Sequence, residues 1–302
     1  KRQMLNRRHI RSIVVQSIYS NSVESLDQEK YKTFILKNSS NAIDLLYCII
    51  DFIKEINGYF INLESKKFSC SYVSKNPYFF FFSKLNSSKF KRNTIINWDL
   101  NLNYIMDLQK DLIALNQKYN DTKVAQEDSY LKFFIESYTS IIANSDMLYE
   151  FLEDQNIYWI NDFPYVNSFL MKNIQKVDIQ NPNSLLLPSL IDYQEEVNFG
   201  QELFLKLMSN ESSLKNHLLG RTPNWDTERI AKIDNAILLT SIAELIYFES
   251  IPTKVTINEY IEIAKEFSSP SSSKFINGIL DKLVKDLTKK GIIVKKGRGL
   301  VT

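Results

Sequence analysis

The sequence contains few of the residues that break helices, bind metals or form disulfides. Its 302 residues include seven glycines, seven prolines, two cysteines and two histidines. Because glycine and proline are scarce and apolar residues seldom alternate, an almost wholly helical protein is expected. Cys48 and Cys70 are too few for a disulfide framework in a chain of this size, and neither has metal-ligand spacing. A reducing compartment fits this cysteine content best.

The chain also shows no arrangement of residues that marks a common catalytic site. His9 and His217 lie far apart, and neither has a neighbouring ligand at metal-binding spacing. The stretch GRG at 297–299 lacks the strand-to-helix context of a phosphate-binding loop. A binding protein without metal or cofactor is therefore favoured over an enzyme, although sites assembled from distant residues leave no such signature.

Long apolar runs are absent as well. None approaches the roughly 20 residues that a membrane-spanning helix needs. The apolar residues behind the basic N-terminus are interrupted by Gln16, Ser17 and Ser20, so no signal-peptide core follows. We therefore expect a soluble cytoplasmic protein with no membrane partner.

Charge is distributed unevenly, although the formal net charge is only +2. The first eleven residues carry no acid and five basic residues, which are Lys1, Arg2, Arg7, Arg8 and Arg11. From Lys282 onward, lysine and arginine greatly outnumber Asp286, the one acid of that segment. The basic residues at both ends of the chain predict an anionic partner. The alternative is that they form two basic tails that contact only solvent.

Apolar residues recur at helical spacing in several segments. They predict helices over about 6–20 and 39–64, another around 130–152, and three consecutive helices in the last third that form a compact bundle. Asp226 is the expected N-cap of the first of these three. The next helix is expected to open at Thr256, which has capping-box spacing to Glu259.

An aromatic segment, NPYFFFFSKLNSSKFKRN at 76–93, has two interpretations. Its aromatic rings alternate with Lys84, Lys89, Lys91 and Arg92, a composition that suits a base-stacking platform. Burial of the phenylalanines in a core is the favoured interpretation, because phenylalanine is mostly buried in folded proteins.

Three segments of the last third carry a resemblance to a known family. RIAKIDNAILLTSIAEL, IPTKVTINEYIEIAKEF and SKFINGILDKL resemble the C-terminal block of the transcription antitermination factor NusB family, and NRRHIRSIVVQSIYS resembles its basic first helix. The resemblance covers 1–20 and 130–287. It implies an all-α, NusB-like helical bundle fold with additional helical insertions and no enzymatic activity. It also implies binding of boxA-like single-stranded RNA together with the ribosomal protein NusE, in the antitermination complex that supports ribosomal RNA transcription.

The chain is about twice the family's usual length. We interpret 1–302 as a single NusB-like all-helical domain, with insertions mainly at about 66–126 and 156–220 and a basic C-terminal tail at 288–302. Some family members resemble dimers that bury the RNA surface, so a homodimer stays open.

The resemblance also implies site residues, transferred position by position. The implied RNA contacts are Arg7, Arg8, Arg11, Lys274 and Phe275. The basic side chains would neutralise phosphates, and Phe275 would stack on an unpaired base unless it is buried in the bundle. Ser271 stands where the family often has aspartate, and it can still cap the last helix.

The implied NusE-binding face includes Tyr19 and Asp234. We expect Asp234 to be an exposed carboxylate that contributes to a complementary interface rather than to folding. The alternative is an acid favoured by the helix dipole, although Asp234 lies deep in the expected helix for that role.

Two competing functions follow from the same residues. A NusB-like domain also precedes the catalytic domain of some RNA cytosine methyltransferases, which need a glycine-rich cofactor-binding region and a catalytic cysteine. Neither Cys48 nor Cys70 has such a context. The second alternative is a helical protein-interaction module in which the insertions have replaced RNA binding.

Overall fold

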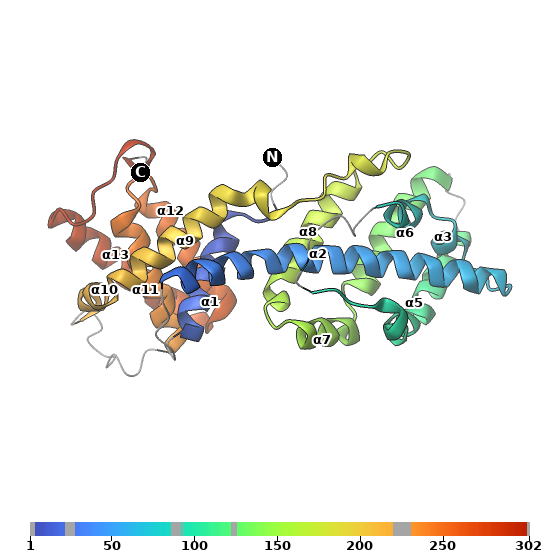
Figure 1. The fold of residues 1–302 in the computed structure, drawn as a ribbon, viewed down its shortest axis with the longest axis horizontal. Helices are drawn as coiled ribbons and strands as arrows, with labels where there is room; N and C mark the ends of the chain where they lie inside the picture. Colours follow the sequence, from blue (N-terminus) through green and yellow to red (C-terminus); the bar gives the residue numbers. More distant parts are fainter. Residues whose placement is uncertain are drawn as a thin grey trace. The chain divides into compact units, whose positions relative to one another are not determined.

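The structure is a computed structural model that describes residues 4–21, 28–85, 92, 94–121, 126–219 and 231–300. Every regular element of this part of the chain is helical, which confirms the all-helical prediction (Figure 1). The α-helices are α1 (Arg7–Asn21), α2 (Gln28–Ser65), α3 (Ser71–Ser74), α4 (Pro77–Ser83), α5 (Asn103–Asn120), α6 (Gln126–Ser137), α7 (Asp146–Gln155), α8 (Trp159–Ile174), α9 (Gln194–Ser209), α10 (Glu211–Leu218), α11 (Lys232–Tyr247), α12 (Thr253–Phe267) and α13 (Pro270–Lys289). None of these helices is both long and apolar enough to cross a membrane.

The helices belong to two compact units. The first contains 1–4 and 40–192, and the second contains 5–39 and 193–302. Helix α2 contributes residues up to Ser39 to the second unit and the rest to the first. The expected insertion at 66–126 lies within the first unit, whereas 156–220 is divided between the two at Tyr193. The behaviour of 1–302 as one domain stays a prediction.

Aromatic side chains fill much of the first unit. Phe79, Phe81 and Phe82 of α4 are buried, and the Phe82 ring stacks on Phe134 of α6 with centroids 5.5 Å apart. Phe80 is exposed, with the Lys84 ammonium group 4.8 Å from its ring centroid. The burial prediction is thus confirmed for three of these four phenylalanines.

Of the basic residues of the same aromatic segment, the structure describes Lys84 and Arg92. The Arg92 side chain is nearly buried, and its Nη1 atom donates a hydrogen bond to Asp51 at 2.6 Å. Lys89 and Lys91 lie outside the described residues. Arg92, at least, is occupied by Asp51 and is not free to contact a base or a phosphate.

The second unit is built around α1 and the C-terminal helices. Helix α1 packs against α9 and α11, while α12 packs against α11 and α13 (Figure 1). Their apolar side chains, among them Ile10, Val14 and Ile237, form one core. A Cβ atom at Gly200 would lie 2.6 Å from Ile10 Cγ2, so glycine permits the close approach of α9 to α1.

Two helices of this unit begin elsewhere than the sequence predicted. Helix α12 begins at Thr253 after Pro252, so Thr256 lies inside the helix and forms no capping box. Helix α13 begins at Pro270, and proline suits a first helical position because the N–H it lacks would be unpaired there. Ser271 does not cap α13; its hydroxyl lies 2.9 Å from the Ser269 hydroxyl instead. The expected cap Asp226 lies outside the described residues.

Candidate functional site

The three arginines of α1 occupy three different environments. Arg11 is buried, and it donates from Nε to Glu244 Oε2 at 2.7 Å and from Nη2 to Glu244 Oε1 at 2.8 Å. Thr256 and Tyr260 of α12 donate to the same carboxylate at 2.8 and 3.1 Å. Glu244 thus accepts four hydrogen bonds from two neighbouring helices, which occupies all the acceptor positions of a carboxylate.

The charge of Glu244 affects the pKa values of both Arg11 and Tyr260 in this network. Burial alone would lower the pKa of Arg11, but the Glu244 carboxylate raises it above its ordinary value. Burial and the charge of Glu244 together raise the pKa of Tyr260 well above the usual range. Arg11 therefore stays charged and Tyr260 stays a hydrogen-bond donor throughout the physiological range.

Arg11, which the resemblance implies to be an RNA contact, lies in the core of the second unit. Its side chain is 4% exposed, and two of its donor groups are bound to Glu244. A phosphate could reach this guanidinium only if the pair opened, which would leave Glu244 buried without its counter-charge. Arg11 is a core residue.

Arg8 is shared between solvent and α12. It donates from Nε and Nη2 to the two oxygens of Glu259, at 2.8 and 3.0 Å, and its side chain is 41% exposed. The hydrogen bond from Arg8 holds the pKa of Glu259 below its usual range. Burial raises the pKa of Glu266 above its ordinary value, and the nearby charge of Arg8 opposes part of this shift. Arg8 therefore lies among carboxylates that already compensate its charge.

Arg7 is the exposed arginine of this helix. Its guanidinium lies 5.1 Å from the centroid of the Phe199 ring, within range of a cation–π contact. The side chain lines a cavity of about 360 Å³ together with Glu195, Asn198, Phe199, Glu202, Phe248, Ser250 and Ile251. Arg7 is thus accessible to an anion.

The start of α13 presents the other two implied RNA contacts. Lys274 is exposed, and Phe275 is partly buried against the core of the second unit. The Phe275 ring therefore combines a packed part with a solvent-accessible part. Both side chains lie in the first turns of α13.

Asp234 is not the exposed carboxylate that the sequence predicted. It is 2% exposed, and it accepts hydrogen bonds from Ser268 Oγ at 2.5 Å and Ser272 Oγ at 2.8 Å. Because α11 begins at Lys232, Asp234 lies in its first turn, where a negative charge is favoured by the helix dipole. Its carboxylate connects the start of α11 to the segment joining α12 and α13.

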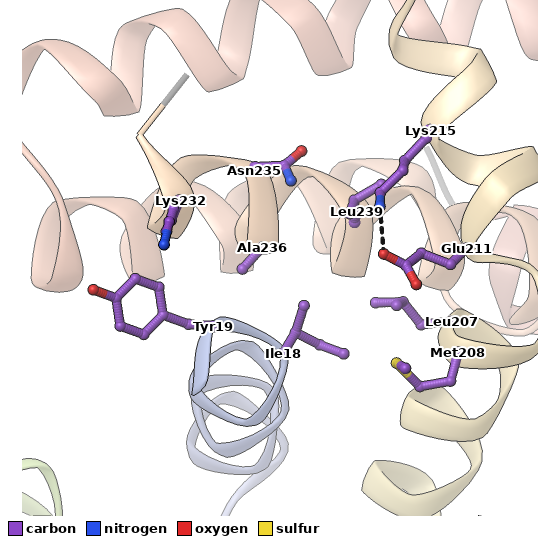
Figure 2. Close-up of a pocket in the computed structure, with 10 residues that line it drawn as sticks. All are labelled: Ile18, Tyr19, Leu207, Met208, Glu211, Lys215, Lys232, Asn235, Ala236 and Leu239. Atoms are coloured by element: carbon purple, nitrogen blue, oxygen red, sulfur yellow. Dashed lines mark ion pairs between the residues drawn. The ribbon is translucent and has the colours of Figure 1, made fainter. Parts of the chain in front are cut away.

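Tyr19, by contrast, is 48% exposed near the end of α1. It lines a cavity of about 220 Å³ with Ile18, Leu207, Met208, Glu211, Lys215, Lys232, Asn235, Ala236 and Leu239. Figure 2 shows Tyr19 and Lys232 on one side and, across the cavity, the ion pair between Glu211 and Lys215 at 2.6 Å. The contributions of α9 and α10 were missed because their segments carry helical periodicity and no motif.

Two kinds of reactive group can be checked among the described residues. Among the residues that the structure describes, no cluster of histidine, cysteine, aspartate and glutamate could hold a metal ion. Burial raises the pKa of the Cys48 thiol to about 12, so this thiol stays protonated and unreactive at neutral pH.

Comparison with known proteins finds relatives of the C-terminal part. The model of the NusB family matches residues 171–285, which include α9 to α12 and most of α13. The transcription antitermination protein NusB of Chloroherpeton thalassium is 43% identical over 95 residues, covering 32% of this chain and 45% of that protein. The NusB protein of Salinibacter ruber is 38% identical over 104 residues, covering 34% and 65%.

The chain therefore spans less than two thirds of the length of these two relatives. It covers more of a third, the transcription antitermination protein NusB of Natranaerobius thermophilus. That protein is 35% identical over 105 residues, which are 33% of this chain and 76% of the relative. With this coverage and the match to the family model, the chain belongs to the NusB family.

Proposed function

We propose that this protein is a transcription antitermination factor that binds boxA-like single-stranded RNA together with the ribosomal protein NusE and supports ribosomal RNA transcription. The main support is that a block of NusB-family sequence packs against a basic first helix taken from the other end of the chain. The names of the relatives describe transcription antitermination in those proteins. The transfer of that role to this chain is part of the proposal.

The proposed RNA surface consists of Arg7, Lys274 and Phe275, with Arg8 at its edge. Arg7 and Lys274 are exposed cations that suit phosphate, and phosphate contacts position RNA without reading its sequence. The accessible part of Phe275 suits stacking on an unpaired base. Arg8 contributes less, because Glu259 already binds two of its donor groups.

The proposed NusE surface is the rim of the cavity at Tyr19. Tyrosine is enriched in protein interfaces because it combines a large apolar ring with a hydroxyl. Ile18, Leu207 and Leu239 supply apolar lining beside Lys232, a cation suited to an acidic group of the partner. Asp234 acts here indirectly, by fixing the first turn of α11 that carries Lys232 and Asn235.

This role requires no catalytic residue and no cofactor, and it places the protein in the cytoplasm with nascent RNA. The competing function is a helical protein-interaction module that has lost RNA binding. One observation favours it: Arg11 and Arg8 are bound by Glu244 and Glu259, which reduces the positive charge that α1 offers to RNA.

Titration with RNA distinguishes the two functions. We expect the full chain to bind a short boxA-like RNA more tightly than a scrambled RNA, and more tightly still when NusE is present. A variant with Arg7→Gln and Lys274→Gln should lose affinity for both RNAs, whereas Lys110→Gln with Lys172→Gln, at exposed lysines of the first unit, should not.

Equal, weak binding of both RNAs with NusE present would refute RNA recognition and support the interaction module. Sedimentation at increasing protein concentration tests self-association in the same samples. A dimer that dissociates when RNA is added would explain weak binding at high protein concentration.

A further inference from the structure

Helix α13 carries a row of exposed lysines that begins at the proposed RNA surface. After Lys274, the row continues with Lys282, Lys285 and Lys289, all of them exposed. At 3.6 residues per turn, these four positions fall within about 80° of the helix circumference and extend over about 22 Å of its length. The buried positions Ile276, Leu283 and Leu287 lie on the opposite side of α13.

One acid interrupts this face. Asp281 is exposed and lies at the edge of the same sector, while Asp286 lies outside it, by the same helical spacing. Four ammonium groups therefore share a face with one carboxylate. We call the three lysines beyond Lys274 the lysine row; they are Lys282, Lys285 and Lys289.

The chain that follows α13 is held in a defined position next to the row. Gly291 has a φ of +70°, and the amides of Gly291 and Ile292 bind the carbonyls of Thr288 and Leu287 at 3.0 and 2.9 Å. These two bonds are those of a Schellman motif, which ends a helix with glycine in the left-handed conformation. The motif turns the chain sharply at the end of the row.

The tail then docks on the segment between α11 and α12. Lys295 Nζ donates to the Phe248 carbonyl at 2.9 Å, and the Lys296 amide donates to the Glu249 carbonyl at 3.0 Å. A Cβ atom at Gly299 would lie 2.0 Å from the Glu249 carbonyl oxygen, so only glycine fits there. The exposed cation Arg298 therefore belongs to a docked segment, whereas Lys290 is the C-cap residue of α13.

We propose that the lysine row binds backbone phosphates of single-stranded RNA that continues beyond the segment held at Lys274 and Phe275. The inference rests on the proposed function, because it takes the RNA surface at the start of α13 as given. Continuity on one helix is its main support: RNA leaving Lys274 along α13 meets three further cations on the same face. Lysine acts as a point charge towards phosphate, so this extension would add affinity without adding sequence preference.

The family comparison adds a second argument. The matched region ends at 285, so Lys289 and the docked tail lie outside it. Lys282 and Lys285 lie inside the matched region, so only the end of the extended surface, at Lys289, would go beyond the matched block.

The test compares two RNAs on the full chain with NusE present: a boxA-like core, and the same core lengthened by about eight uridines at either end, within the site sizes of single-strand binders. The wild-type protein should bind one lengthened RNA more tightly and with a steeper salt dependence. In the variant Lys282→Gln, Lys285→Gln, Lys289→Gln, binding of the core should be unchanged. For the lengthened RNA, the loss of three phosphate contacts should flatten the slope of log affinity against log salt by about two. Between about 50 and 200 mM salt, the fold-loss of affinity should then be about 20 times smaller for this variant than for the wild-type protein.

Two further variants control for charge and folding. Lys110→Gln, Lys172→Gln, Lys176→Gln removes the same charge from exposed positions of the first unit and should behave as wild type. Replacing the three lysines of the row with arginine should keep the wild-type slope, because the charge and the helix propensity are both retained.

The outcomes separate the two proposals. If the wild-type protein does not bind the core RNA, the proposed function and the lysine-row inference both fail. If it binds the core but gains nothing from either extension, or if the glutamine variant keeps the wild-type slope, only the lysine-row inference fails. Loss of NusE binding with an unchanged slope would identify the row as a protein-binding face and would equally overturn it.

Discussion

Replacing Glu244 with glutamine tests whether the arginines of α1 serve the core or the surface. The side chain of Glu244 is fully buried and accepts from Arg11, Thr256 and Tyr260. The amide of the glutamine variant has only one acceptor oxygen, and its NH₂ group would face donor groups of the residues that now bind Glu244. Arg11 would then lose its direct counter-charge and keep only the more distant Glu259 carboxylate, 3.9 Å from Nη1; breaking a buried pair from one side costs about 3–5 kcal/mol.

The measurement must report on the second unit separately, because a chain with two compact units need not unfold in one step. Hydrogen exchange of backbone amides in α1, α11 and α12 gives the local free energy of opening, and amides of α5 and α8 in the first unit serve as the internal control. Glu244→Gln should lower protection in the second unit only. The double variant with Arg11→Met should cost less than the sum of the two single variants, because it removes both charges together.

The opposite result would refute the network. If Arg11→Gln and Glu244→Gln each cost less than about 1 kcal/mol, as is typical of exposed pairs, the pair is not buried in solution. If Arg11→Gln also flattens the salt dependence of RNA binding, Arg11 contacts phosphate, as the resemblance to the NusB family implies.

Three other predictions follow from the same unit. Asp234→Ala should lower the free energy of unfolding by about 1–3 kcal/mol, because it leaves two serine hydroxyls without their acceptor. Urea denaturation followed by hydrogen exchange measures this change, and an unchanged stability would mean that Asp234 is exposed. Because the pKa of Glu259 is lowered in the folded protein, its pairing with Arg8 stabilises above the unfolded pKa of about 4.3 and is lost as the pH falls below that value. Arg8→Gln should therefore weaken the pH dependence of thermal stability between about pH 5 and 3, and an identical dependence in both proteins would contradict the pairing. Phe275→Ala should cost about 1–3 kcal/mol of RNA-binding free energy with an unchanged salt slope, whereas a changed slope would mean that the variant disturbs neighbouring cations.

The sequence alone determined the helical class and much of the core. Helical periodicity is a local property, so the apolar face of α1 with Ile10 and Val14 and the burial of Phe79, Phe81 and Phe82 follow from spacing and residue type. The resemblance to the NusB family was equally visible, because it lies in contiguous segments.

The tertiary structure decided which charges face solvent. Arg7, Arg8 and Arg11 are equivalent in the sequence, yet one is exposed, one is shared with Glu259 and one is buried on Glu244. The carboxylates that bind Arg8 and Arg11 lie on helices more than two hundred residues away. Whether a charged side chain meets water or a carboxylate depends on that long-range packing, which local spacing does not encode.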